Sequence, residues 1–205
     1  MPGPDDARLA LAAHNLLRVD AGWLSPKAAL WLKGTNGKIP TGYIAMGDKV
    51  VTRIVDTAAG KIGLVFFPQG PVPEKAPTPE QEEQALAAGK ALHGKVNLVI
   101  GISPWGAVGE TAFLRKASGV FGCLLGSGEG IGFAQSLSEA RGVFWVRPDS
   151  QGRAINVLEI LEMPAPGTTP EWLEGVTFRA NMDFLDDSCP TDAAMLRLIG
   201  APPPR

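Results

Sequence analysis

The sequence predicts a single α/β domain, residues 1–205, with a mixed sheet that has a parallel centre, antiparallel additions and helices on both faces. The runs at 96–102 and 120–125 are apolar at consecutive positions, which is typical of strands covered on both faces. Helical segments separate these two runs from each other and from a strand-like run at 62–67. This order predicts a parallel sheet, because each crossover helix returns the chain to the same edge.

The N-terminal part, residues 1–60, is expected to contain helices followed by a β-meander. Leucines among alanines predict a helix at 5–18. A second helix is predicted at 25–34, where a serine supplies the N-cap, a proline opens the first turn and a glycine ends the helix. Three strand-like runs then predict an antiparallel meander: residues 42–46, 49–55 and 61–67.

The α/β core is expected at 61–160, and its first connection is a proline-rich loop at 68–77. Whether this loop is a lid stays open. Thr78 and Gln81 have the spacing of a capping box, so we expect them to begin a helix that ends at Gly94.

The rest of the core is expected to repeat this pattern and then depart from it. A helix is predicted at 107–119, between the two buried strands. Residues 142–148 and 153–160 flank a turn and predict a hairpin that adds an antiparallel edge. The C-terminal segment, 161–205, is expected to pack back on the core, with a short helix at 191–199.

The composition argues against several classes of partner. Of the residues, 45% are hydrophobic and 20% are charged, as in globular proteins, and the net charge of −2 provides no basic surface for nucleic acid. No apolar stretch approaches the roughly 20 residues that cross a bilayer, so we expect no membrane partner. The N-terminus lacks the features of a secretory signal, so the expected location is cytoplasmic. Self-association into a homo-oligomer stays open.

Cysteine and histidine are too rare to indicate a metal site or a disulfide framework. Cys123 lies in an apolar run and is expected to be a buried thiol, and Cys189 is the second cysteine. The two histidines, His14 and His93, are far apart in the chain, and we assign them to helix packing and to a helix end. No motif identifies a cofactor.

A candidate ligand site follows from the parallel arrangement. In open parallel sheets, ligands bind beyond the carboxyl ends of the strands, where the loops after residues 67, 102 and 125 should meet. The second loop begins Ser-Pro-Trp-Gly and the third is rich in glycine, so both allow close backbone approach. The candidate ligand-binding residues are Ser103, Trp105, Gly106, Glu110, Gly126, Ser127, Gly128, Glu129 and Gly130.

Serine-hydrolase and nucleotide-binding chemistry do not fit these loops. The residue after a nucleophilic serine must donate its N–H to the oxyanion, and Pro104, which follows Ser103, has no N–H. Both histidines precede Ser103, whereas the histidine of such a site follows its serine. The glycines of the third loop recur every two residues, which is not the spacing of a dinucleotide loop, and no Gly-Lys-Ser or Gly-Lys-Thr ends a phosphate loop.

The sequence favours the binding of a small polar metabolite between the Ser103–Gly106 turn and the Gly126–Gly130 loop. Ser103 is expected to hydrogen-bond the ligand, and the glycine loop to direct backbone N–H groups at it. Glu129 opposes an anion there and favours a cation or a ligand with hydroxyl groups. Two alternatives remain: an enzyme that uses Glu110 or Glu129 as general base, and a non-catalytic subunit of a protein complex.

Overall fold

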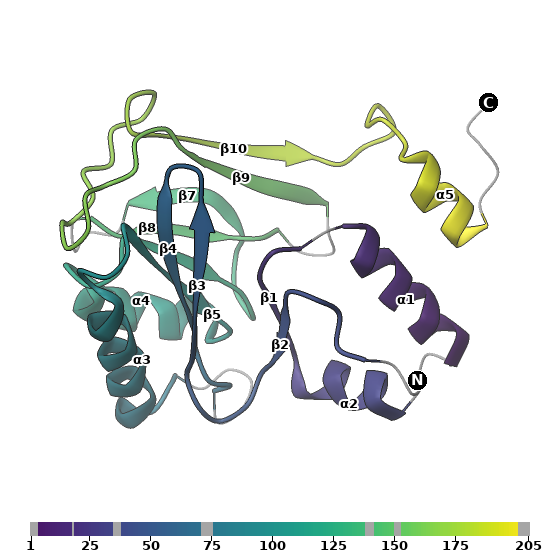
Figure 1. Ribbon diagram of the computed structural model, residues 1–205, viewed down its shortest axis with the longest axis horizontal. Helices are drawn as coiled ribbons and strands as arrows, with labels where there is room; N and C mark the ends of the chain where they lie inside the picture. Colours follow the sequence, from purple (N-terminus) through teal and green to yellow (C-terminus); the bar gives the residue numbers. More distant parts are fainter. Residues whose placement is uncertain are drawn as a thin grey trace. The chain divides into compact units, whose positions relative to one another are not determined.

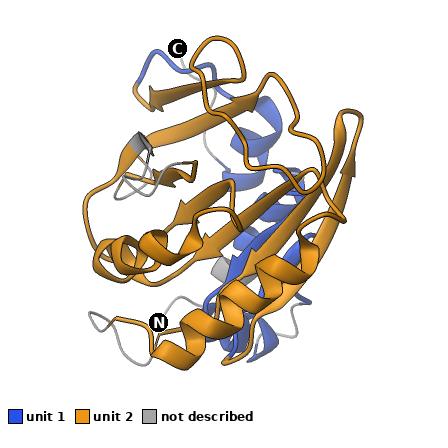
Figure 2. Cartoon of the chain, turned by 90° about the vertical axis from the view of Figure 1, so that its left-hand side faces the viewer, with its two compact units in different colours: residues 1–47, 187–205 blue, residues 48–186 orange. Residues whose placement is uncertain are grey.

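The computed structural model describes residues 4–17, 19–34, 38–70, 76–137, 142–149 and 153–200. Contacts divide the chain into two units, residues 1–47 with 187–205 and residues 48–186 (Figure 2). The expected α/β core lies in the larger unit, and a single domain that spans the whole chain stays a prediction. In the described part of the chain, no helix is both long and apolar enough to cross a membrane.

The smaller unit contains a two-stranded parallel sheet and helices from both ends of the chain (Figure 1). Ser25 caps the second helix as predicted, because its Oγ accepts a hydrogen bond from the Ala28 N–H at 3.2 Å. His14 Nδ1 and the Tyr43 hydroxyl are hydrogen-bonded at 2.9 Å, which ties α1 to β2. The elements are α1 (Pro4–Leu16), β1 (Gly22–Leu24), α2 (Pro26–Gly34), β2 (Tyr43–Ala45) and α5 (Ala193–Ile199).

A six-stranded mixed sheet forms the centre of the larger unit, in the order β3-β4-β5-β6-β8-β7. Strands β4, β5, β6 and β8 are parallel, and β3 and β7 are antiparallel at the two edges. The prediction of neighbouring parallel strands near 62–67, 96–102 and 120–125 is confirmed. The strands are β3 (Val51–Thr57), β4 (Gly60–Phe66), β5 (Leu98–Ser103), β6 (Cys123–Gly126), β7 (Phe133–Leu137) and β8 (Phe144–Arg147).

The predicted meander is wrong in its first strand. β3 and β4 form the expected antiparallel hairpin, but residues 42–46 contribute β2, which pairs in parallel with β1. Both β1 and β2 are three residues long, so the alternation of their side chains specifies a partner only weakly.

Both helices described in the larger unit, α3 (Pro79–Leu92) and α4 (Gly106–Ala117), pack on the same face of the sheet. Their buried residues share an apolar cluster with Val99 of β5, whereas the neighbouring Leu98 belongs to a second cluster on the other face. The prediction of helices on both faces is therefore wrong for this unit. The crossovers β4–α3–β5 and β5–α4–β6 advance in the same direction, and right-handed crossovers in one direction place their helices on one side.

The other face is covered by a hairpin of β9 (Ala154–Ile160) and β10 (Phe178–Phe184) (Figure 1). The predicted hairpin between 142–148 and 153–160 is wrong, because β8 pairs with β6 and β7, and β9 pairs with β10. Consecutive apolar residues let β8 be buried on both faces, which suits an internal strand better than an edge. Strand β7 was not predicted.

Helix α3 begins and ends as predicted. The Thr78 hydroxyl accepts from the Gln81 N–H at 3.2 Å, and Gln81 Oε1 accepts from the Thr78 N–H at 3.0 Å, which completes the capping box. Gly94 follows the helix with a φ of +83°. Two predicted segments lie partly outside the described residues: positions 71–75 of the proline-rich loop predicted at 68–77, and positions 150–152 of the turn predicted between 148 and 153.

Candidate functional site

The loops after β4, β5 and β6 meet at the carboxyl edge of the sheet, as their parallel arrangement requires. The Trp105 indole donates to the Pro68 carbonyl at 2.8 Å, which joins the loop after β5 to the loop after β4. The Ser127 hydroxyl donates to the Ser103 carbonyl at 2.8 Å, and the Gly106 N–H donates to the Ser127 carbonyl at 3.0 Å. The structure thus brings the candidate residues of the second and third loops together.

Ser103 and Trp105 are buried at this edge. Ser103 is 0% exposed, and its Oγ accepts a hydrogen bond from the Trp105 N–H at 3.2 Å. The Trp105 ring packs on Phe67 and Phe113, with ring centroids 4.6 and 5.4 Å apart. Ser103 therefore supports the turn and Trp105 closes the end of the apolar core, so a ligand would contact either side chain only after the turn opened.

Glu110 is also buried, and its carboxylate reaches the glycine loop from α4. Oε1 accepts from the Ser127 N–H at 3.1 Å, and Oε2 accepts from the Trp145 indole at 3.0 Å and from the Arg147 guanidinium. Burial raises the pKa of Glu110, while its attraction to Arg147 and these hydrogen bonds oppose the rise. The carboxylate therefore has a protein partner at each oxygen.

The glycines of the loop make room for this arrangement. A Cβ at Gly126 would lie 2.0 Å from Glu110 Oε2, so no other residue fits there while the carboxylate holds its position. Gly128 has a φ of +80°, and a Cβ on it would lie 2.8 Å from the Pro104 carbonyl oxygen. Close packing thus accounts for glycine at both positions.

Arg147 joins the glycine loop to Glu110 of α4, and it was not among the predicted site residues. It ends β8 and is 1% exposed. A guanidinium carries five N–H groups, and one carboxylate and four backbone carbonyls accept from them here. The available signal was a charged residue at the end of an apolar strand, but 142–148 was wrongly assigned to a hairpin at the edge of the sheet, where a charged residue is ordinary. The acceptors are Glu110 and Ser127 O for Nη1, Gly128 O and Glu129 O for Nη2, and Ile131 O for Nε.

The glycine loop turns its carbonyl groups inward and its amide groups outward. The carbonyls of Ser127, Gly128 and Glu129 accept from Arg147 at 3.3, 3.0 and 2.8 Å. The described peptide bonds are trans, and in a trans peptide the N–H points opposite to the C=O. The N–H groups of Gly128, Glu129 and Gly130 therefore point away from Arg147, and these three residues are exposed.

The same loop caps helix α4. The Gly106 N–H donates to the Ser127 carbonyl at 3.0 Å, and the Ala107 N–H donates to the Glu129 carbonyl at 2.8 Å. The first N–H groups of a helix commonly bind anions, but at α4 the protein's own carbonyls take that place. Gly106 permits this contact, because its φ is +72° and a Cβ would lie 3.1 Å from the Glu129 carbonyl oxygen.

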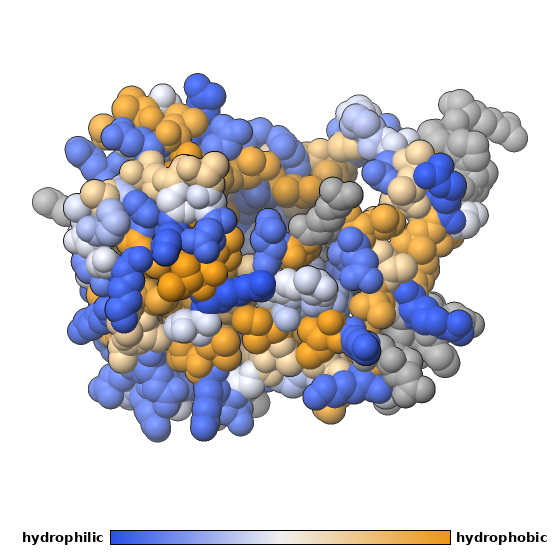
Figure 3. Space-filling view, in the orientation of Figure 1, coloured by the Kyte–Doolittle hydropathy of each residue, from blue (hydrophilic) through white to orange (hydrophobic). Residues whose placement is uncertain are grey.

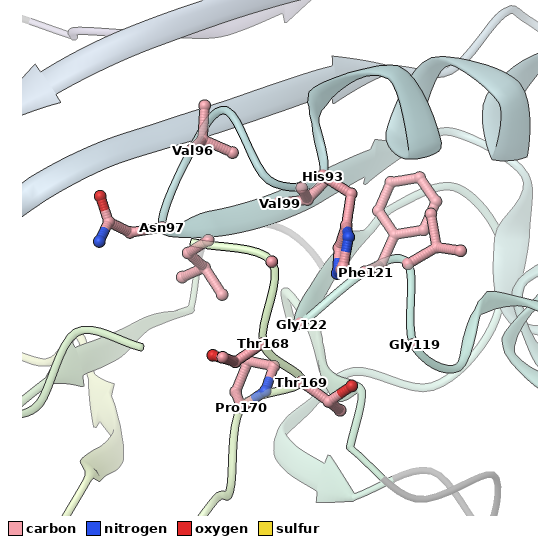
Figure 4. Close-up of a pocket in the computed structure, with 13 residues that line it drawn as sticks. His93, Val96, Asn97, Val99, Gly119, Phe121, Gly122, Thr168, Thr169 and Pro170 are labelled. Carbon is pink, nitrogen blue, oxygen red and sulfur yellow. The ribbon is translucent and has the colours of Figure 1, made fainter. Parts of the chain in front are cut away.

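A small hollow lies at the opposite, amino edge of the sheet (Figure 4). It is lined by the end of α3, the starts of β5 and β6 and residues 167–170, and it has room for about one water molecule. His93 extends into it from the end of α3 (Figure 4). Asn97 spans this edge, since it accepts from the Lys61 N–H at 2.9 Å and donates to the Pro164 carbonyl at 3.0 Å. The candidate ligand-binding residues lie at the other edge.

In the described part of the chain, no three His, Cys, Asp or Glu side chains are placed to hold one metal ion. The glycine loop instead has backbone N–H groups that point away from Arg147, and backbone N–H groups are donors to oxygen atoms. A comparison of the chain with protein-family models gives no match, and a comparison with curated proteins gives none either. The chemistry of this edge is therefore inferred from its own geometry.

Proposed function

We propose that this protein binds a small polar metabolite, through an oxygen atom of that ligand, on the outer side of the Gly126–Gly130 loop. The observation that carries the proposal is a set of three N–H groups, on the exposed residues Gly128, Glu129 and Gly130, that point away from Arg147. Successive backbone N–H groups on one side of a loop hold an oxygen atom, and hold a charged one most strongly.

Arg147 stabilises the conformation of this loop from its buried side. Its hydrogen bonds to the loop carbonyls hold the N–H groups in one orientation before a ligand arrives, which lowers the entropy cost of binding. Glu110 compensates the buried guanidinium charge. In this proposal Ser103, Trp105 and Glu110 shape the loop, and direct contact with the ligand is confined to Gly128–Gly130.

The geometry favours binding over catalysis by Glu110. A general base must lie within hydrogen-bond reach of the proton that it removes. Glu110 is 0% exposed, and both of its oxygens accept hydrogen bonds from the protein. Glu129 is exposed at the tip of the loop, so it is the carboxylate of this pair that a substrate could reach.

The alternative of a non-catalytic subunit requires a large exposed apolar surface. On the face drawn in Figure 3, apolar residues lie in small groups among hydrophilic ones. This face therefore gives the alternative little support. Sedimentation of the purified protein over a range of concentrations tests whether the chain associates with itself.

The proposal is tested by NMR titration of the ¹⁵N-labelled protein with sodium acetate, inorganic phosphate and glucose, each at matched ionic strength. We expect the amide signals of Gly128, Glu129 and Gly130 to shift and to saturate with acetate, because a bound oxygen changes the environment of each N–H. The absence of saturable shifts at these three amides with all three probes would overturn the proposal.

Two variants test whether the Arg147 hydrogen bonds and the Glu129 charge affect ligand binding by the loop. Arg147→Lys keeps the positive charge but cannot form the planar set of hydrogen bonds, so we expect acetate to bind several-fold more weakly. Arg153→Lys, at an exposed arginine, is the matched control and should bind as the wild type does. Glu129→Gln lies on the surface and removes a like charge, so it should strengthen acetate binding even if Arg147→Lys fails to fold. Unchanged affinity in both Arg147→Lys and Glu129→Gln would contradict the proposal.

A further inference from the structure

Two highly exposed apolar residues are close in the chain to the segments that form this loop surface. Ile131 is 83% exposed and Val108 is 76% exposed, the highest exposed fractions among the large apolar residues of the described chain. The segments that carry them are in contact, because the Ala107 N–H donates to the Glu129 carbonyl at 2.8 Å and a Cβ on Gly130 would lie 2.5 Å from the Ala107 Cβ. Val108 and Ile131 directly follow these contact residues in the chain.

This neighbourhood combines hydrogen-bond donors with apolar surface. Single exposed apolar residues are common in proteins, but here two of them directly follow residues of segments that contact each other at the glycine loop. Covering Val108 and Ile131 is favourable in proportion to the apolar area that is removed from water. A ligand that carries both an oxygen and an apolar part would gain from both features at once.

Glu129 limits the charge of such a ligand. Glu129 is exposed on the same loop, so its carboxylate repels a bound anion. It repels a dianion about twice as strongly as a monoanion. The backbone N–H groups carry no net charge that could offset a second negative charge. A monocarboxylate therefore fits this surface better than a phosphate dianion.

We infer that the ligand is an amphipathic monocarboxylate. Its carboxylate lies on the N–H groups of Gly128–Gly130, and its aliphatic or aromatic part covers Val108 and Ile131. The inference rests on the proposed function, because it requires the loop to bind the carboxylate. It adds the class of ligand, and it predicts that affinity rises with the length of the apolar chain.

The test compares acetate, butanoate, hexanoate and octanoate in the same NMR titration. We expect the dissociation constant to fall about twofold for each added methylene, which is less than full burial gives, because an exposed surface covers one side of the chain. In Ile131→Ser and Val108→Ser this dependence on chain length should flatten. Ile54→Ser, which removes a 46% exposed apolar side chain of β3, is the matched control and should keep the full dependence.

The outcomes separate the two proposals. If none of the four carboxylates shifts the Gly128–Gly130 amides, the amphipathic class is wrong, and if phosphate and glucose shift none of them either, the proposed function fails as well. If all four bind with the same dissociation constant, binding stands and the amphipathic class is wrong. The class is also wrong if the chain-length dependence survives in both Ile131→Ser and Val108→Ser, or if phosphate binds more tightly than octanoate.

Discussion

The two edges of the parallel sheet are built from different groups. At the carboxyl edge, Glu110, Arg147 and the glycine-loop carbonyls are buried and satisfy one another. At the amino edge, a small hollow lies beside His93 and Asn97, with apolar, glycine and threonine residues around it. The comparison shows that polar residues at adjacent strand ends predict a polar network, but not a cleft, because the same groups can occupy the space that a ligand would need.

This difference has energetic consequences. In a buried network whose members satisfy one another, removal of one partner leaves the others desolvated and unpaired. Asn97 at the amino edge is half-buried, and water can replace some of the hydrogen bonds that its side chain makes. Substitutions at the carboxyl edge should therefore cost more than substitutions at the amino edge.

Arg147→Ala is expected to have the largest effect. It leaves the Glu110 carboxylate buried without its charge partner, which should lower the free energy of unfolding by about 3–5 kcal/mol. Urea denaturation measures this loss, and Arg153→Ala, at an exposed arginine, should change stability by less than about 0.5 kcal/mol. Equal effects of the two substitutions would mean that the carboxyl edge is not a cooperative network.

Gly126→Ala should be the next most costly substitution. The new methyl group would lie 2.0 Å from Glu110 Oε2, and displacing that carboxylate should cost about 1–3 kcal/mol in the same denaturation experiment. Gly34→Ala is the control, because a Cβ at Gly34 meets nothing within 4 Å and should change stability little. A neutral Gly126→Ala would show that the carboxylate can move freely.

Asn97→Ala tests the amino edge. It removes the hydrogen bonds to the Lys61 N–H and the Pro164 carbonyl, so the expected loss is about 1–2 kcal/mol. The hollow beside Asn97 can admit water, which limits the penalty for the groups left behind. A loss as large as that of Arg147→Ala would erase the contrast between the two edges.

The pH dependence of stability should also come from the carboxyl edge. Burial raises the pKa of Glu110 above its ordinary value of 4.5, so in the window above 4.5 the native protein binds more protons than the unfolded chain. The free energy of unfolding contributed by Glu110 therefore falls as the pH rises through the raised pKa. Denaturation between about pH 4 and about pH 7 should show wild type losing stability relative to Glu110→Gln. The opposite trend would mean that attraction to Arg147 outweighs burial.

Local signals predicted many of the elements. The capping box of Thr78 and Gln81 and the cap at Ser25 depend on residues within three positions of each other, and both occur in the structure. The buried strands β5 and β6 were recognisable because consecutive apolar residues are typical of strands covered on both faces. The partners of β2, β8 and β9 were predicted wrongly, since pairing depends on segments that are distant in the chain.

The order of strands and helices was enough to predict which loops gather at the carboxyl edge, because that order decides where parallel strands end. It therefore located Ser103, Glu110 and the glycine loop in one neighbourhood. The burial of Glu110 against Arg147, 37 residues away, could not be predicted in this way, and neither could the orientation of the loop carbonyls toward that guanidinium. Burial and charge pairing join groups that are far apart in the chain, and the local pattern of apolar residues does not predict such pairs.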